Sequence, residues 1–206
     1  MLPSRFQSAV DFASFAHAGR CFPQGHPEHN VVQMRKFSEG VEYIVHPIRC
    51  AKAALRYGLS DELIKAMLLH DVIEDCGVSY DDVLNAFEFP VTLIVWGLTN
   101  AEARFGAYSE LGWNRAKRKA HDLKYMAAQP ELTRMGKLID LADNLNDWPA
   151  NDKFLDIFLT EVYPLGLALG HKGVLADVLG DFLRAHGDAK LRRAIYVTKH
   201  PKGGDA

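Results

Sequence analysis

The chain has 206 residues and a mass of 23.0 kDa, the size of one domain or of one domain with a modest extension. A formal net charge of -2, with 48% hydrophobic residues, excludes a basic field for nucleic acids but allows a large core. Three widely spaced cysteines without a CxxC pair argue against a disulfide framework or a zinc ribbon. No apolar run has the length of a signal peptide or a membrane span, so we expect a cytoplasmic protein.

The N-terminal part predicts one helix followed by a long loop. Apolar residues recur at intervals of three and four along most of the chain, which indicates helices. The first amphipathic stretch runs from about Pro3 to Ala18, and Gly19 can end it. Residues 20–40 hold two prolines, two glycines and two histidines without periodicity. Loops of this length are usually functional or disordered.

The next segments predict a series of shorter helices. One covers residues 43–58 and stops at Gly58. Ser60 is a good N-cap for a helix over residues 61–76. The stretch SYDD, residues 79–82, is a capping-box variant that opens another helix. Residues 91–99 fit a strand or a buried helix, and their helical neighbours favour a helix.

The C-terminal half continues the helical pattern. A basic helix at residues 113–128 precedes Pro130, and a further helix covers residues 131–147. Beyond Pro149 we expect at least two more helices, interrupted at Pro164 and Gly170. We therefore predict one all-α domain, with a core in residues 1–150, C-terminal helices in 151–199 packed on it, and a flexible tail at 200–206.

The stretch MLLHDVIEDC, residues 67–76, carries unexpected charge at the end of an apolar helix. Burying a charge costs several kcal/mol unless it is paired or bound to a metal. On a continuous helix, His70 and Glu74 share a face, and so do Asp71 and Asp75. Three neighbouring carboxylates repel one another unless a cation offsets them, so this helix end indicates a cation site.

Two other segments offer matching groups. YIVHP supplies His46, and LIDLADNLND, residues 138–147, supplies Asp143 among apolar residues that turn it inward. Taken singly, each is ordinary: a histidine before proline often starts a helix, and an aspartate often faces solvent. Together they form a His2Asp2 set in apolar helices, which suits manganese or iron better than a closed structural zinc site.

Histidine, then His-Asp, then aspartate on helices is the signature of the HD-domain metal-dependent phosphohydrolases. Within that superfamily the chain resembles the hydrolase domain of the RelA/SpoT alarmone enzymes and their small stand-alone relatives over roughly residues 6–150. Those proteins usually show segments like RKSGxPYIxHPLxVA, ALLHDxVEDT and KLADRLHN. The corresponding segments here, in the same order, are HAGR, RKFSEGVEYIVHPIRCA, LLHDVIEDCGVSYDDV, GLTN and LIDLADNLND.

The resemblance implies a single helical HD-domain bundle around a metal site, with manganese as the usual ion. It implies removal of the 3′-pyrophosphate from a nucleoside 3′,5′-polyphosphate, a guanosine or adenosine alarmone. It also assigns roles to particular side chains: metal ligands His46, His70, Asp71 and Asp143; a catalytic pair, Glu74 and Asp75; and a nucleotide-flanking pair, Arg35 and Lys36.

Some residues depart from the family pattern. Where the family reads KLADRLHN, residues 140–147 read DLADNLND, so Asn146 and Asp147 stand near the expected nucleotide position. We include both as substrate-binding candidates. A carboxylate cannot donate a hydrogen bond at neutral pH, so Asp147 predicts a preference for a substrate other than ppGpp, unless it merely caps its helix or faces solvent. Residues 20–34 resemble an insertion.

Other functions fit the same residues. One is an HD phosphohydrolase for another nucleotide, such as NADPH or a nucleoside monophosphate. A second is a non-enzymatic nucleotide sensor, which the retained ligand set and Glu-Asp pair argue against. We do not expect a bifunctional synthetase-hydrolase, because too few residues follow position 150 for a nucleotidyltransferase domain. We expect a small nucleotide as the binding partner, with neither nucleic acid nor a membrane, and the sequence leaves the oligomeric state open.

Overall fold

The computed structural model describes residues 2–36, 38–100, 112–170 and 173–200, and every regular element in these ranges is helical. The all-α fold class is therefore confirmed for the described residues. An isolated antiparallel bridge joins Met34 and Glu42 in the long loop. The elements are η1 (Ser4–Phe6), α1 (Gln7–Phe15), η2 (Ala16–Arg20), α2 (Val45–Arg56), α3 (Asp61–Leu69), α4 (Val72–Asp75), α5 (Tyr80–Ala86), α6 (Phe89–Leu98), α8 (Arg115–Ala127), α9 (Glu131–Asp147), α10 (Leu155–Leu169) and α11 (Ala176–Lys199).

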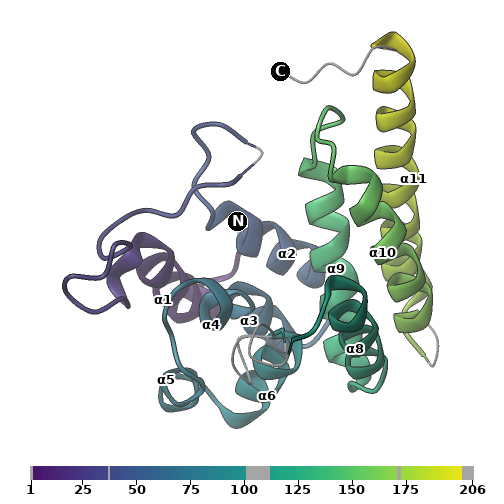
Figure 1. The fold of residues 1–206 in the computed structure, drawn as a ribbon. Helices are drawn as coiled ribbons and strands as arrows, with labels where there is room; N and C mark the ends of the chain where they lie inside the picture. Colours follow the sequence, from purple (N-terminus) through teal and green to yellow (C-terminus); the bar gives the residue numbers. More distant parts are fainter. Residues whose placement is uncertain (1, 37, 101–111, 171–172, 201–206) are drawn as a thin grey trace.

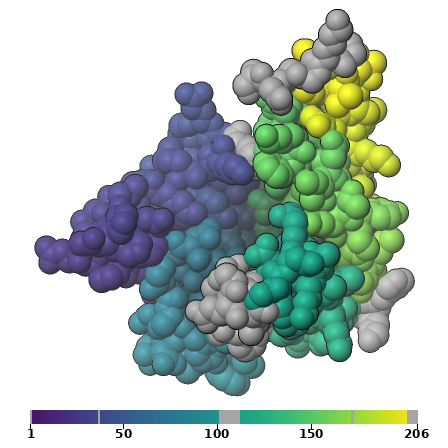
Figure 2. Space-filling view, in the orientation of Figure 1, coloured from purple at the N-terminus to yellow at the C-terminus, as the bar shows by residue number. Residues whose placement is uncertain are grey.

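Helix α3 lies at the centre of the core. Its residues Leu63, Ile64, Met67 and Leu68 are completely buried. It contacts α1, α2, α6 and α9, while α9 also packs along α11 (Figure 1). The space-filling view places the N-terminal segment and the C-terminal helices on opposite sides of the molecule (Figure 2). The elements that carry the predicted metal ligands are thus packed directly on one another.

The predicted helix boundaries follow local capping chemistry. The Ser60 side chain accepts a hydrogen bond from the backbone N–H of Leu63. Ser79 and Asp82 form the predicted capping box. Residues 89–98 form α6, which confirms the helix predicted there over a strand. These ends were predictable because a side chain satisfies backbone groups that the helix leaves unpaired.

The single helix predicted over residues 61–76 is wrong at one point. Helix α3 ends at Leu69, and the short α4 begins only at Val72. At the break, Asp71 has φ -101° and ψ -5°, outside regular helical geometry. His70 and Glu74 therefore do not share the face of one continuous helix, and the break redirects the chain within the acidic stretch.

The interruption predicted at Pro164 is also wrong, because α10 continues through this residue. Proline there removes the bond to the carbonyl four residues earlier, which costs about 3 kcal/mol in an isolated helix. Tertiary packing offsets that cost. At Gly166, α10 approaches α11 so closely that an added Cβ would lie 2.0 Å from the ring of Phe182.

The C-terminal end of the chain is described only in part. Helix α11 ends at Lys199, and the N–H of His200 donates to the carbonyl of Tyr196. The rest of the tail predicted to be flexible, residues 201–206, lies outside the described residues. In the described ranges, no helix combines the length and apolar character needed to cross a membrane.

Candidate metal centre

Four side chains from three helical regions converge on one point. His46 comes from the first turn of α2, His70 and Asp71 from the break after α3, and Asp140 from α9. The two Nε2 atoms of the histidines lie 3.2 Å apart. Oδ2 of Asp71 lies 3.1 Å from Nε2 of His70, and Oδ1 of Asp140 lies 3.2 Å from Nε2 of His46. We call these residues the four-residue cluster.

Local sequence explains why His46 is held so firmly. The next residue, Pro47, stands in the first turn of α2, where its missing N–H would have had no helical partner. The N–H of His46 donates to the carbonyl of Tyr43 at 2.9 Å. The His46 side chain is completely buried, so its position is set by packing as well as by backbone.

The hydrogen bonds of the two imidazoles fix which nitrogen faces the cluster. Nδ1 of His70 lies 2.9 Å from the carbonyl of Met67, so Nδ1 carries the proton. Nδ1 of His46 lies 2.6 Å from Oδ2 of Asp143 and is protonated for the same reason. In their neutral forms, both rings therefore direct Nε2 lone pairs at each other and at the two carboxylates. Burial alone would lower the pKa of both imidazoles, but the neighbouring carboxylates raise it, so a positive charge is favourable here, whether a proton or a metal ion supplies it.

The distances within the four-residue cluster suit one ion. Ligands about 2.1 Å from a common metal lie roughly 3.0–3.5 Å from one another. The corresponding separations here run from 3.1 to 3.7 Å. Tyr43 donates its hydroxyl proton to Asp71, and Lys137 donates to Asp140, both at 2.7 Å. These outer contacts orient the carboxylates, as the partners of metal ligands commonly do.

Cys50 lies close to the same histidines, and its ligand atom falls within 4.8 Å of theirs. Its sulfur, however, lies 3.7 Å from Nδ1 of His46, on the edge of the ring that faces away from His70. Burial raises the pKa of the Cys50 thiol well above its ordinary value, and Asp143 and Asp140 add to this rise. By distance, the carboxylates complete the donor set better than Cys50, since their oxygens lie 3.1 and 3.2 Å from the Nε2 atoms.

Of the four expected metal ligands, Asp143 is the one that the structure places apart from the Nε2 atoms. Asp143 does not reach the Nε2 atoms, because it accepts hydrogen bonds from Nδ1 of His46 and from Arg49, the latter at 2.8 Å. Asp140, one turn earlier on α9, instead brings Oδ1 within 3.2 Å of Nε2 of His46 and 3.7 Å of Nε2 of His70. The family segment KLADRLHN also fits residues 137–144, three positions earlier, where it matches Lys137, Leu138, Asp140 and Asn144.

Glu74 and Asp75 lie beside the cluster and are held by different partners. Glu74 accepts bonds from the backbone N–H and side-chain amide of Asn100, at 2.5 and 2.6 Å. Asp75 accepts a bond from Nε2 of Gln33 at 3.0 Å. Burial, assisted by the charge of Asp71, raises the pKa of Glu74 to about 7 and that of Asp75 to about 6. Both carboxyl groups are thereby tuned toward proton exchange near neutral pH.

A cavity of about 380 Å³ opens between α6, α8, α9 and α10 and reaches the cluster. Its wall includes Glu74 and Asp140, together with the ammonium-bearing side chains Lys119 and Lys137. From the basic helix α8, Lys119 lines this cavity, whereas Arg115 pairs with Glu161 at its edge. The volume lies within the range of small-ligand pockets, and the two ammonium groups share the wall with the carboxylates of Glu74, Asp122, Asp140 and Glu161.

The four substrate-binding candidates fall in different places. Arg35, only 9% exposed, donates to Asp147 at 3.0 Å and to Asn144 at 3.3 Å. Asp147 also pairs with Arg49. Lys36, next to Arg35, is exposed. Asn146 is exposed too and lines a separate cavity between α2, α9 and α11.

Sequence reasoning missed several of the residues that build this site. Asp140 and Lys137 carried a usable signal, since they match the K-L-x-D spacing of the family segment in the earlier register. Tyr43 matches the tyrosine of the family segment YIxHP, whereas Gln33 and Arg49 carried no signal beyond their proximity to motif residues. Their contacts join positions far apart in the chain, which spacing alone cannot reveal.

Over its described residues the chain is all-helical, and two imidazoles and two carboxylates converge in the four-residue cluster. A solved structure has the same fold: that of a metazoan SpoT ortholog described as hydrolyzing ppGpp. The two superpose with a TM-score of 0.71 at 21% identity, over 93% of this chain and 98% of the other. No protein-family model matches the chain.

The sequence is similar to named pyrophosphohydrolases. It is 31% identical over 115 residues to guanosine-3′,5′-bis(diphosphate) 3′-pyrophosphohydrolase MESH1 of Danio rerio, covering 55% of this chain and 57% of that protein. It is 25% identical over 150 residues to MESH1 of Drosophila melanogaster, covering 72% of each chain. The match with the zebrafish protein thus spans little more than half of its length. The resemblance to the stand-alone SpoT-like proteins, predicted from the motifs, is confirmed.

Proposed function

We propose that the protein is a metal-dependent phosphohydrolase that removes the 3′-pyrophosphate from a nucleoside 3′,5′-polyphosphate, a guanosine or adenosine alarmone. The observation that carries the proposal is the meeting of two imidazole Nε2 atoms and two carboxylates beside Glu74 and Asp75. The pyrophosphohydrolase activity for which the MESH1 relatives are named supports the same reaction class.

His46, His70, Asp71 and Asp140 would hold the ion, for which we propose Mn²⁺. Two nitrogens and two carboxylate oxygens form a mixed set that suits a borderline divalent metal and leaves coordination positions for water and substrate. When bound, such an ion would lower the pKa of a water molecule and polarise a phosphoryl oxygen. Asp143 would support the site from outside by fixing the proton of His46 on Nδ1.

Glu74 and Asp75 would manage the protons of the reaction. Their raised pKa values, about 7 and about 6, let them accept a proton from the attacking water near neutral pH. Asn100 holds Glu74 through two bonds, so that this carboxylate stays at the edge of the cluster. Lys119 and Lys137 in the adjoining cavity would offset phosphate charge.

A substrate panel tests the proposal. The wild-type protein with Mn²⁺ is incubated with ppGpp, pppGpp, ppApp, pApp, NADPH and simple mononucleotides, and products are separated by anion-exchange chromatography. We expect pyrophosphate release from a 3′-pyrophosphate nucleotide, abolished by EDTA and by His70→Ala. If phosphate is released only from NADPH or from a monophosphate, the protein catalyses another HD-type reaction. Ligand binding without turnover would indicate a nucleotide sensor.

A further inference from the structure

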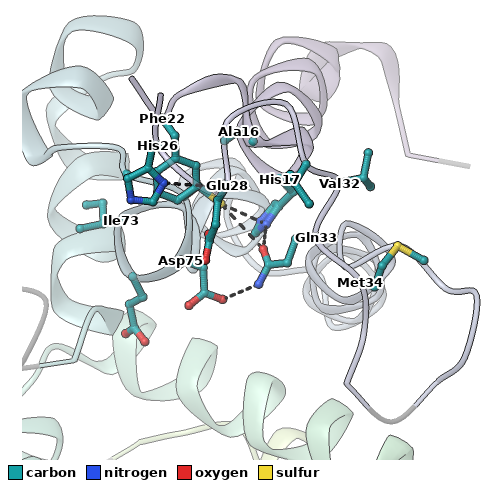
Figure 3. Close-up of a pocket in the computed structure, with 15 residues that line it drawn as sticks. Ala16, His17, Phe22, His26, Glu28, Val32, Gln33, Met34, Ile73 and Asp75 are labelled. Atoms are coloured by element: carbon teal, nitrogen blue, oxygen red, sulfur yellow. Dashed lines mark hydrogen bonds between the residues drawn. The ribbon is translucent and has the colours of Figure 1, made fainter. Parts of the chain in front are cut away.

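A second cavity lies on the side of α4 that faces the long loop. Its volume is about 660 Å³, and its wall joins Glu74 and Asp75 to residues of the 16–34 segment (Figure 3). That wall contains the carboxylate of Glu28 and no lysine or arginine, so it does not suit a phosphate group. Within this wall, the long loop contacts Asp75, one member of the proposed catalytic pair.

Three side chains form a directed series of hydrogen bonds in this wall. Nδ1 of His17 lies 2.7 Å from Oε1 of Gln33, and Nε2 of Gln33 donates to Oδ2 of Asp75 at 3.0 Å (Figure 3). An ionised carboxylate can only accept, so the amide must turn its NH2 group toward Asp75. Its carbonyl then faces His17, which must donate from Nδ1. Each contact enforces the other.

The protonation state of His17 is suited to this role. The side chain is only 3% exposed, and burial lowers the pKa of His17, so the ring is neutral. The Nδ1 proton is its one donor, while its buried Nε2 has no hydrogen-bond partner among the described residues. The sulfur of Cys76 also lies 3.1 Å from Nδ1. His17 is thus a fixed donor and not a group that exchanges protons at neutral pH.

The backbone holds Gln33 beside His17 even though residues 18–32 separate them. The N–H of Gln33 donates to the carbonyl of His17 at 2.8 Å, and the N–H of Asn30 donates to the carbonyl of Gly19 at 3.1 Å. Gly19 has φ +73°, and an added Cβ would lie 2.2 Å from the carbonyl oxygen of Glu28. The loop therefore closes tightly at its base, which brings its two ends together.

We propose that Gln33 is a positioning residue for Asp75 and that His17 sets the direction of its amide. The proposal rests on the function proposed above. Gln33 occupies Oδ2 of Asp75 and restricts rotation of the carboxylate, so that Oδ1 remains available for the proton of the attacking water. The loop between His17 and Gln33 thereby becomes part of the catalytic support instead of an added surface feature.

The principal test compares Gln33→Met with wild type. Methionine has a similar length but no N–H donor, so kcat should fall about 10- to 100-fold, as expected for losing a bond to a charged group. KM should stay within about twofold, and bound Mn²⁺ should be unchanged. Val32→Ala, in the same loop and cavity wall, is the matched control and should keep the wild-type kcat. An unchanged kcat in Gln33→Met would overturn the proposal.

Variants of His17 provide a rescue test that a purely structural role would not satisfy. His17→Leu removes the donor and should lower kcat as Gln33→Met does. His17→Asn keeps an N–H close to the position of Nδ1 and should restore most of that loss. Equal kcat values in the two variants, with equal melting temperatures, would contradict the assigned direction of the amide.

A measurement without turnover separates this proposal from the proposed function. In protein loaded with diamagnetic Mg²⁺ and ¹³C-labelled at aspartate carboxyls, Asp75 is assigned by comparison with Asp75→Asn. Losing the Gln33 donor should raise the pKa of Asp75 by about one unit, because the bond favours the charged form. If the wild type hydrolyses nothing on the panel, the proposed function fails. The pKa shift of Asp75 then still tests whether Gln33 donates a hydrogen bond to it. An equal pKa of Asp75 in the wild type and in Gln33→Met would refute the proposed role of Gln33.

Discussion

The Nδ1 atom of His46 lies 2.6 Å from Oδ2 of Asp143, on the edge of the ring opposite the nitrogen that faces His70. Of the two α9 aspartates, Asp140 is thus the one whose carboxylate approaches both Nε2 atoms. Arg49 also donates two hydrogen bonds to Asp143, and its positive charge offsets that of the carboxylate. Neighbouring aspartates on one helix therefore have different chemical tasks.

The first prediction separates these two tasks by metal content. Asp140→Asn should lose stoichiometric Mn²⁺ because a charged donor leaves the cluster. Asp143→Asn should keep the ion with an affinity about 10- to 100-fold weaker, the usual cost of altering the partner of a ligand. Elemental analysis after dialysis, followed by competition titration, gives both values. The opposite ranking would return the fourth ligand position to Asp143.

The second prediction concerns proton transfer. Glu74→Gln combined with Asp75→Asn should retain Mn²⁺ and the far-ultraviolet spectrum of the wild type. Because these groups exchange protons in the proposed mechanism, kcat should fall roughly 10²- to 10⁴-fold. Single-turnover kinetics on the preferred substrate measure the chemical step directly. A double variant with nearly wild-type kcat would remove this pair from the mechanism.

The third prediction revises the role of Asp147. The sequence suggested that this carboxylate changes substrate preference, but the structure pairs it with Arg35 and Arg49. Asp147→Ala leaves the nearly buried Arg35 without its carboxylate, so the free energy of unfolding should fall by about 1–3 kcal/mol. The ratio of kcat/KM for ppGpp to that for ppApp should stay within about threefold. A large change in this ratio at unchanged stability would restore the specificity role.

The fourth prediction links the metal to stability. An ion that binds the folded state at 100 times its Kd adds about 2.7 kcal/mol, which for a chain of this size raises Tm by about 5–10 °C. EDTA should therefore lower the Tm of the wild type, and excess Mn²⁺ should restore it. Asp140→Asn serves as the control and should show no such response in thermal melts. An equal response in both proteins would place the stabilising ion elsewhere.

Much of the fold follows from short-range chemistry that is visible in the sequence. The Ser60 N-cap, the Ser79–Asp82 capping box and helix α6 were predicted because side chains satisfy backbone groups only a few residues away. Pro164 could not be predicted this way. The helix continues through this proline where α10 packs against α11, and that contact joins residues far apart in the chain.

The register of the aspartate segment shows the same limit within the site. The family segment KLADRLHN matches residues 140–147 at Leu141, Ala142, Asp143 and Leu145. It matches residues 137–144 equally often, at Lys137, Leu138, Asp140 and Asn144. Asp140 and Asp143 are three residues apart and share a helix face, so periodicity favours neither.

By itself, the sequence determined that His46, His70 and Asp71 are polar groups in apolar helices that need a common partner, because burial of unpaired charge is costly. Only the tertiary structure shows where the two aspartates lie, since the packing of α9 on α2 places Asp140 at the Nε2 edge of His46 and Asp143 at the Nδ1 edge. It also decided that Gln33 meets Asp75. Such contacts depend on how far one element is shifted along and rotated against its neighbour, and residue spacing within a single helix gives neither quantity.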